Sequence, residues 1–86
     1  MPTISRFFGI TIRMYFDDHP PPHFHAHYGE HDAKIRIDTL EVEAGHLPRR
    51  ALALVLEWAF EHRDELRQNW VLAEAHQPVI RVEPLK

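Results

Sequence analysis

Histidines are concentrated in one short stretch of this 86-residue sequence, DDHPPPHFHAHYGEH, at residues 17–31. The stretch holds five of the eight histidines of the chain, together with three consecutive prolines and two aromatic residues. Imidazole is a common ligand of transition metals, and its ordinary pKa of about 6.5 lets it exchange protons near neutral pH. The segment is therefore where the sequence points to a metal site or to general acid–base chemistry.

The residues HFHAHY, at positions 23–28, alternate as the residues of a β-strand do. On a strand, His23, His25 and His27 share one face, and we expect the apolar residues between them to face the core. Alternate residues lie about 6.5–7 Å apart along a strand, so two imidazoles can converge on one cation such as zinc, nickel or manganese. His23 and His25 are the first candidate ligands. The candidates for a third ligand are His19, His27, His31, Asp17 and Asp18.

The same histidines allow catalysis without a metal. Two imidazoles that flank a phosphodiester, with an arginine to neutralise the developing charge, can cleave RNA by general acid–base chemistry. The available cations are Arg13, Arg36, Arg49 and Arg50, and the last two begin a predicted helix whose amino terminus attracts anions. A third alternative is that the histidines are solvated side chains on a strand face. The residues alone leave all three alternatives open.

The first half of the chain has the pattern of β-strands that must position these side chains. Apolar residues alternate with polar ones in GITIRMYFDD, at positions 9–18, and again in HFHAHY. A turn is expected at GEHD, and AKIRIDTLEVEA then contains two alternating runs with a break near Asp38–Thr39. This pattern predicts an antiparallel meander with one face on a core.

The second half has helical spacing from Pro48 to about residue 75. An unbroken helix of that length would span about 42 Å, so we expect a kink around His62–Asp64, with Asp64 as the cap of a second helix. Trp58 and Trp70 are expected in the packing between helix and sheet. The run VIRVEP after Pro78 predicts a final strand. The expected fold is one α+β domain over residues 1–86, with a small antiparallel sheet (a meander of about four strands plus a short C-terminal strand) packed against one long or kinked helix.

Composition restricts the functional classes. The ten basic and thirteen acidic residues give a net charge of −3, which argues against a module that binds duplex DNA through a broad basic surface. There is no cysteine, which suits a reducing compartment. No apolar stretch is long enough to span a bilayer, so we expect a cytoplasmic protein without a membrane partner.

Three blocks of the sequence resemble a small bacterial family that is one of the numbered domains of unknown function: PTISRFFGITIRMYF, DDHPPPHFHAHYGE and LPRRALALVLEWAFEHRDELRQNW. The resemblance runs over nearly the whole chain. The matching positions of the family motif are Asp18, His19, Pro21, Pro22, His23, Phe24, His25, Tyr28, Gly29, Pro48, Arg49, Arg50, Glu57 and Trp58. The motif leaves His27 and His31 free, which favours His23 and His25, with His19 or an aspartate, as the site.

The resemblance implies the toxin side of a two-gene toxin–antitoxin module, with a small antitoxin-like protein encoded nearby as its partner. If the protein is an enzyme, we expect a ribonuclease-like hydrolase. His23 and His25 would then act as acid and base or hold a divalent metal, and Arg49 or Arg50 would contact phosphate. The alternative is a non-catalytic metal- or protein-binding module that docks a partner, or a second copy of itself, through its sheet edge or helix.

Overall fold

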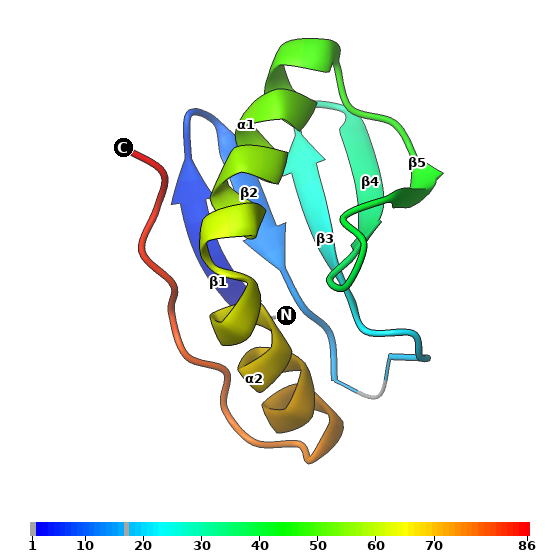
Figure 1. Cartoon of the computed structure of the whole chain (residues 1–86), viewed down its shortest axis with the longest axis vertical. Coiled ribbons are helices and arrows are strands. Elements are labelled where there is room, and N and C mark those ends of the chain that lie inside the picture. The colour runs from blue at the N-terminus through cyan, green and yellow to red at the C-terminus, as the bar shows by residue number, and fades with distance from the viewer. Residues whose placement is uncertain (1, 17) are drawn as a thin grey trace.

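The computed structural model describes residues 2–16 and 18–86, in which the first half of the chain forms a sheet and the second half forms helices (Figure 1). The strands are β1 (Thr3–Phe7), β2 (Ile10–Arg13), β3 (His23–Tyr28), β4 (His31–Arg36) and β5 (Val42–Gly45). They form one antiparallel sheet in the order β1-β2-β3-β4-β5. The α+β class and the antiparallel meander are confirmed, but the meander has five strands rather than about four.

One face of the sheet carries the core and the other is polar. The buried hydrophobic side chains of the three central strands are Ile10, Ile12, Phe24, Ala26, Ala33 and Ile35. The residues between them point to the opposite face, because side chains alternate along a strand. On that face Arg13 pairs with His25, and His25 pairs with Lys34 on the next strand. Directly opposed residues share a face, so the sheet gathers histidines and cations on its polar side.

Helices α1 (Arg49–Glu61) and α2 (Arg63–Glu74) supply the other half of the core (Figure 1). Trp58 of α1 is fully buried, with its ring centroid 5.3 Å from that of Phe7 and 6.0 Å from that of Phe24. Trp70 of α2 is also buried in the same core. Both tryptophans therefore pack between helix and sheet, as predicted.

The helical half is interrupted at His62, inside the segment where a kink was expected. His62 has φ of −120° and ψ of 25°, outside the α-helical range, and it caps the end of α1 and the start of α2. The kinked form of the predicted helix is therefore correct, and the single long helix is wrong. Asp64 is not the cap of the second helix; it lies in the first turn of α2, where a carboxylate interacts favourably with the helix dipole.

The predicted C-terminal strand is wrong, because residues 78–86, all of them described, form no strand. This segment runs past α2, α1 and β1 (Figure 1), and the amide of Val82 donates one hydrogen bond of 2.8 Å to the carbonyl of Ile4. Val82 is buried, but Ile80, two residues earlier, is 54% exposed, so the alternation of the sequence does not correspond to one buried face. A single backbone hydrogen bond does not make a ladder with β1.

Side chains from the helices hold this C-terminal segment instead. The side-chain amide of Asn69 donates to the carbonyl of Ile80 and accepts from its N–H, both at 2.8 Å. The indole N–H of Trp58 donates to the carbonyl of Glu83 at 2.8 Å. Both anchoring side chains are buried, so the segment closes the core along β1. The opposite edge strand, β5, is exposed at all four of its residues.

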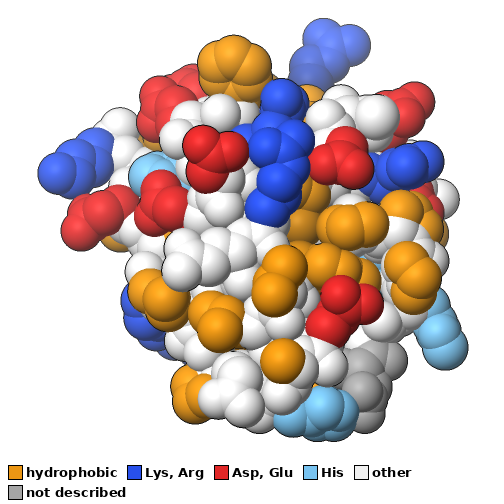
Figure 2. Space-filling model, turned by 60° about the horizontal axis from the view of Figure 1, so that its bottom comes forward, with side chains coloured by type: hydrophobic (Ala, Val, Ile, Leu, Met, Phe, Trp, Pro, Cys, Tyr) orange, Lys and Arg blue, Asp and Glu red, His pale blue; other side chains and the backbone are white. Residues whose placement is uncertain are grey.

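No helix in the described part of the chain is long and apolar enough to cross a membrane. Figure 2 brings forward the end of the molecule that is lowest in Figure 1, where hydrophobic side chains lie exposed among charged ones and histidines. Acidic and basic side chains alternate across this view, so charge does not mark it as a surface for a polyanion.

Candidate metal centre

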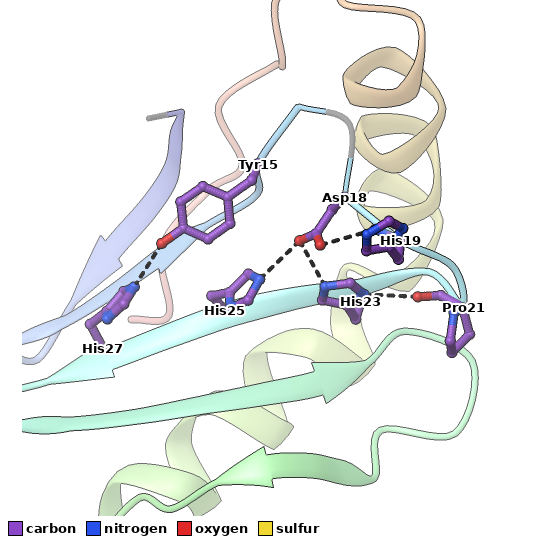
Figure 3. Close-up of polar contacts among 7 residues, drawn as sticks. All are labelled: Tyr15, Asp18, His19, Pro21, His23, His25 and His27. Carbon is purple, nitrogen blue, oxygen red and sulfur yellow. Dashed lines mark hydrogen bonds and ion pairs between the residues drawn. The ribbon is translucent and has the colours of Figure 1, made fainter.

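The loop between β2 and β3 brings Asp18 against the first histidines of β3 (Figure 3). The Oδ2 atom of Asp18 lies 2.8 Å from Nε2 of His23 and 3.1 Å from Nε2 of His25. The other carboxylate oxygen of Asp18 accepts a hydrogen bond of 3.0 Å from the backbone amide of His19. Two imidazole nitrogens from one strand thus converge on a single carboxylate oxygen from the preceding loop.

The hydrogen bond made by Nδ1 of His23 determines what its other ring nitrogen, Nε2, can offer to Asp18. Nδ1 of His23 lies 2.8 Å from the carbonyl oxygen of Pro21, which only accepts, so Nδ1 carries the proton of that bond. A neutral His23 then has a lone pair on Nε2, and this lone pair faces the lone pairs of Asp18. The arrangement needs a positive charge between them, either a proton on Nε2 or a metal ion. A histidine whose Nδ1–H is held by a carbonyl is also a common form of metal ligand.

The cluster is closed on one side and open on the other. The side chain of His23 is fully buried beneath the loop. Its ring centroid lies 5.0 Å from that of His25 and 5.1 Å from that of Trp70 in α2. The side chains of Asp18 and His25 keep 22% and 24% of their exposure. A molecule from solvent therefore reaches the carboxylate and His25, while His23 forms the floor of the site.

The two accessible groups of the site, Asp18 and His25, both have a pKa below the ordinary value. Burial lowers the pKa of His25, and the hydrogen bond with Asp18 opposes this shift only in part. Burial on its own would raise the pKa of Asp18, but the hydrogen bond with His25 and the charge of His23 lower it overall. At neutral pH the site thus favours a carboxylate and a neutral His25, the forms that coordinate metals.

The three residues have the arrangement of a metal site. One ligand atom from each of Asp18, His23 and His25 lies within 4.8 Å of the others. Tetrahedral zinc has bonds of about 2.0–2.1 Å to nitrogen and oxygen, which places its ligand atoms about 3.3 Å apart. The observed contacts of 2.8 and 3.1 Å are therefore a few tenths of an ångström shorter than those around an ion. Two histidines and one carboxylate with an open side suit catalytic zinc and also iron(II).

The structure places the other predicted ligands outside this cluster. His19 is exposed and contributes its backbone amide. His27 contacts Asp32 through Nδ1, and its Nε2 is 3.5 Å from the hydroxyl of Tyr15. His31 begins β4 and lies beside His46, with ring centroids 5.8 Å apart. Asp17 lies outside the described residues.

Arg49 and Arg50 begin α1 and do not lie beside the histidine cluster. Arg50 lines a pocket together with Tyr28, the last residue of β3, whereas His23 is the first residue of that strand. The five residue steps from His23 to Tyr28 separate the two ends by about 17 Å at 3.3 Å per step. The cations that do share the face of the cluster come from the neighbouring strands.

Three cations surround the histidines on the polar face. Arg13 and Lys34 are the direct partners of His25, and Arg36 is the direct partner of His23. Among the described residues, the Nε atoms of Arg13 and Arg36 are buried without a hydrogen-bond partner. Arg36 forms an ion pair with Glu43, with 3.9 Å between its Nε and the carboxylate oxygen, which is beyond hydrogen-bonding distance. Buried guanidinium nitrogens without a hydrogen bond are unfavourable unless a ligand or water meets them.

Three residues of the site, Lys34, Tyr15 and Pro21, were missed by the sequence interpretation. Lys34 lies beside His25 only through the pairing of β3 with β4. Tyr15 lies with its ring edge-on to that of His25, at 4.5 Å between centroids (Figure 3). Its alternation with Met14 would have placed it on the polar face, but the path of the loop after β2 is not readable from a pattern. Pro21 acts through its backbone carbonyl, which no side-chain motif reveals.

Residues 9–71 match the family described as "Domain of unknown function (DUF4160)". The chain belongs to this family. The DUF4160 match covers more than half of the chain and contains the loop and strand that carry Asp18, His23 and His25. No curated protein and no solved structure matches the chain. The expected membership of an uncharacterised family is therefore confirmed, and the family description assigns no activity.

Proposed function

We propose that this protein binds a divalent transition-metal ion through Asp18, His23 and His25 and uses it for hydrolysis. The observation that carries the proposal is the convergence of the two Nε2 atoms on one carboxylate, with the Nδ1–H of His23 held by the carbonyl of Pro21. A bound ion of this class supplies a Lewis acid and an activated water. The chain supplies three ligands and a side open to solvent.

The surrounding charges support a phosphate ester as the substrate. Arg13, Lys34 and Arg36 stand on both sides of the histidines, and they would neutralise the phosphate oxygens of a substrate that reaches the open side of the cluster. Arg13 and Lys34 would orient the phosphate beside His25, and Arg36 would add positive charge at the strand position next to it. RNA is the substrate class that we propose first, consistent with the toxin-type role that the family resemblance implies.

A metal-free mechanism is the second candidate. It is favoured by the hydrogen-bonding distances themselves, because a protonated His23 in contact with Asp18 satisfies every partner without an ion. The lowered pKa of His25 keeps its imidazole neutral and able to accept a proton near pH 7. In this case His25 would be the general base, His23 would hold Asp18 in place from the floor of the site, and solvent water would protonate the leaving alkoxide.

Metal content decides between these two mechanisms. The untagged protein, purified without a metal-affinity column, would be analysed by inductively coupled plasma mass spectrometry alongside His25→Ala and the control His31→Ala. We expect close to one equivalent of a transition metal in the wild type and in His31→Ala, and its loss in His25→Ala. A protein that stays metal-free after incubation with zinc, nickel, manganese or iron(II) would exclude the metal mechanism.

The toxin-type role is tested in cells. Induced expression in a bacterial host should inhibit growth and be accompanied by RNA cleavage, whereas His25→Ala should be harmless at the same level of folded protein. Co-expression with the small protein encoded beside it should restore growth. Normal toxicity of His25→Ala would separate the toxic activity from this site and refute the proposal.

A non-catalytic docking role has one structural observation in its favour. Strand β5 is an edge strand, and all four of its residues, Val42–Gly45, are exposed. An open edge accepts a strand from another chain, including a second copy of this one. The hydrogen bond from the amide of Arg36 to the carbonyl of Glu41 flanks the pair Ile35–Val42, so the N–H of Val42 faces away from β4. Substituting proline for Val42 would remove this donor from the open edge. If Val42→Pro lost partner binding while the protein cleaved no RNA in any form, the docking role would replace the hydrolytic one.

A further inference from the structure

The turn between β1 and β2 has a residue that does not suit its conformation. Phe8 and Gly9 form a two-residue hairpin loop between the paired residues Phe7 and Ile10, with φ of +48° and +80°. Such turns favour asparagine, aspartate or glycine, because both central residues need positive φ. A bulky aromatic residue in this conformation is a genuine outlier. The side chain of Phe8 is 59% exposed, so little burial offsets the strain.

This exposed ring forms the wall of a pocket. The pocket has a volume of about 280 Å³ and is lined mainly by Phe8, Tyr28, Pro48 and Leu54, with Arg50 as its charged residue. Drug-sized ligands occupy pockets of about 300–1,000 Å³, so this one suits a single large side chain. It lies at the far end of β3 from the histidine cluster and does not depend on the proposed hydrolytic function.

The positive charge of Arg50 at the pocket indicates which charged group a bound molecule needs. Within the described residues, Arg49 and Arg50 have no ion-pair partner, and the first turn of α1 has neither an acidic residue nor a side-chain cap. None of the described residues that line the pocket carries a carboxylate. An apolar hollow beside an unpaired arginine is complementary to an apolar side chain that lies next to a carboxylate.

We propose that the Phe8 pocket, defined by Phe8, Tyr28, Pro48, Leu54 and Arg50, docks a short segment of a partner protein. The segment places a large apolar side chain between Phe8 and Tyr28, and an adjacent carboxylate pairs with Arg50. Aromatic residues and arginine are the residue types that contribute most to binding at protein interfaces. The strain at Phe8 is then explained by binding, since an aromatic ring at the tip of the hairpin reaches over the pocket.

The test uses the ¹⁵N-labelled full chain and two peptides, acetyl-Asp-Leu-Phe-Asp-amide and its neutral counterpart acetyl-Asn-Leu-Phe-Asn-amide. We expect the acidic peptide to shift the backbone amide signals of Gly9, Arg50 and Ala51, and the neutral peptide to bind at least tenfold more weakly. Arg50→Gln should remove the difference between the peptides. Equal shifts with both peptides, or none at millimolar concentration, would overturn the proposal.

Phe8→Asn separates a binding role from a structural one. Asparagine suits positive φ, so this variant should keep or raise the Tm of the protein while it loses binding of the acidic peptide at least tenfold. A lower Tm would identify Phe8 as a packing residue and would overturn the proposal. Inorganic phosphate that reproduces the peptide shifts, or self-association that disappears in Phe8→Asn, would assign the pocket to an anion or to a second copy and would also overturn it.

Discussion

His23 donates a hydrogen bond from Nδ1 to the carbonyl oxygen of Pro21 at 2.8 Å. This one contact determines the chemistry of its other nitrogen, which must face Asp18 either protonated or through a cation. The proline-rich loop therefore does more than connect two strands. It supplies the carboxylate of Asp18 and also the carbonyl that orients the fully buried imidazole beneath it.

Replacement of Asp18 by asparagine should abolish metal binding without unfolding the protein. The amide keeps the shape of the carboxylate but lacks its charge, and even outer-shell partners of metal ligands contribute about 10–100-fold to affinity. We expect a loss of more than about 100-fold, measured by competition with a chromophoric chelator. Asp32→Asn is the matched control, because Asp32 contacts His27 on the same face of the sheet. Equal losses in both variants would point to a general effect of charge.

The two histidines of the cluster should differ in their contribution to stability. His23 is buried against Trp70 with both nitrogens bonded, so His23→Ala leaves a cavity and unpaired polar groups. We expect a loss of about 2–4 kcal/mol in the free energy of unfolding. His25 is partly exposed, and His25→Ala should cost about 1 kcal/mol or less. Urea denaturation with a chelator present measures both. Equal costs would contradict the assignment of His23 as the floor of the site.

The sequence pattern predicted the sheet well because alternation is a local property. The alternation of apolar and polar residues in β3 correctly placed Phe24 and Ala26 in the core and the histidines on the opposite face of the sheet. The same alternation puts His23 on the face opposite the core, where a solvated side chain was one of the alternatives, but His23 is fully buried. Alternation assigns a side of the strand, and it does not report which loop or helix covers that side.

The predictions that failed depended on contacts between distant parts of the chain. VIRVEP alternates as a strand does, but side chains of Asn69 and Trp58 hold it in place of a ladder, and neither was predicted to do so. Arg13 was among the cations that the sequence offered, but only the pairing register shows that it lies beside His25. Pairing register is decided by the turns and by core packing together, and a motif search does not capture it.

Acid should destabilise the metal-free protein in two steps. The folded-state pKa of His25 is lowered, so the unfolded chain binds more protons, and stability is lost as the pH falls through the ordinary value of 6.5 toward the lower folded value. The folded-state pKa of Asp18 is also lowered, so its contribution is complete above its ordinary value of 3.8 and is lost below it.

Chemical denaturation at a series of pH values would resolve the two steps. His25→Gln should remove the step near neutral pH, and Asp18→Asn should remove the acidic one. His31→Gln, which alters an exposed histidine outside the cluster, should leave both in place. A pH profile that is unchanged in His25→Gln would show that this residue titrates alike in the folded and unfolded chains.

Asn69 should be as important for the C-terminal segment as a strand pairing would be. Its side chain is buried and satisfies both the N–H and the carbonyl of Ile80, each at 2.8 Å. Asn69→Ala removes both hydrogen bonds and leaves those backbone groups unpaired, so we expect a loss of about 2–3 kcal/mol. Hydrogen exchange at the amide of Ile80 should accelerate by at least about tenfold, while the amides of β3 keep their relative protection. Gln68→Ala, on an exposed position of the same helix, is the control. If exchange at Ile80 were unchanged, the segment would be held by the burial of Val82 and by Trp58 alone, and the helix would not need a polar side chain at this buried position.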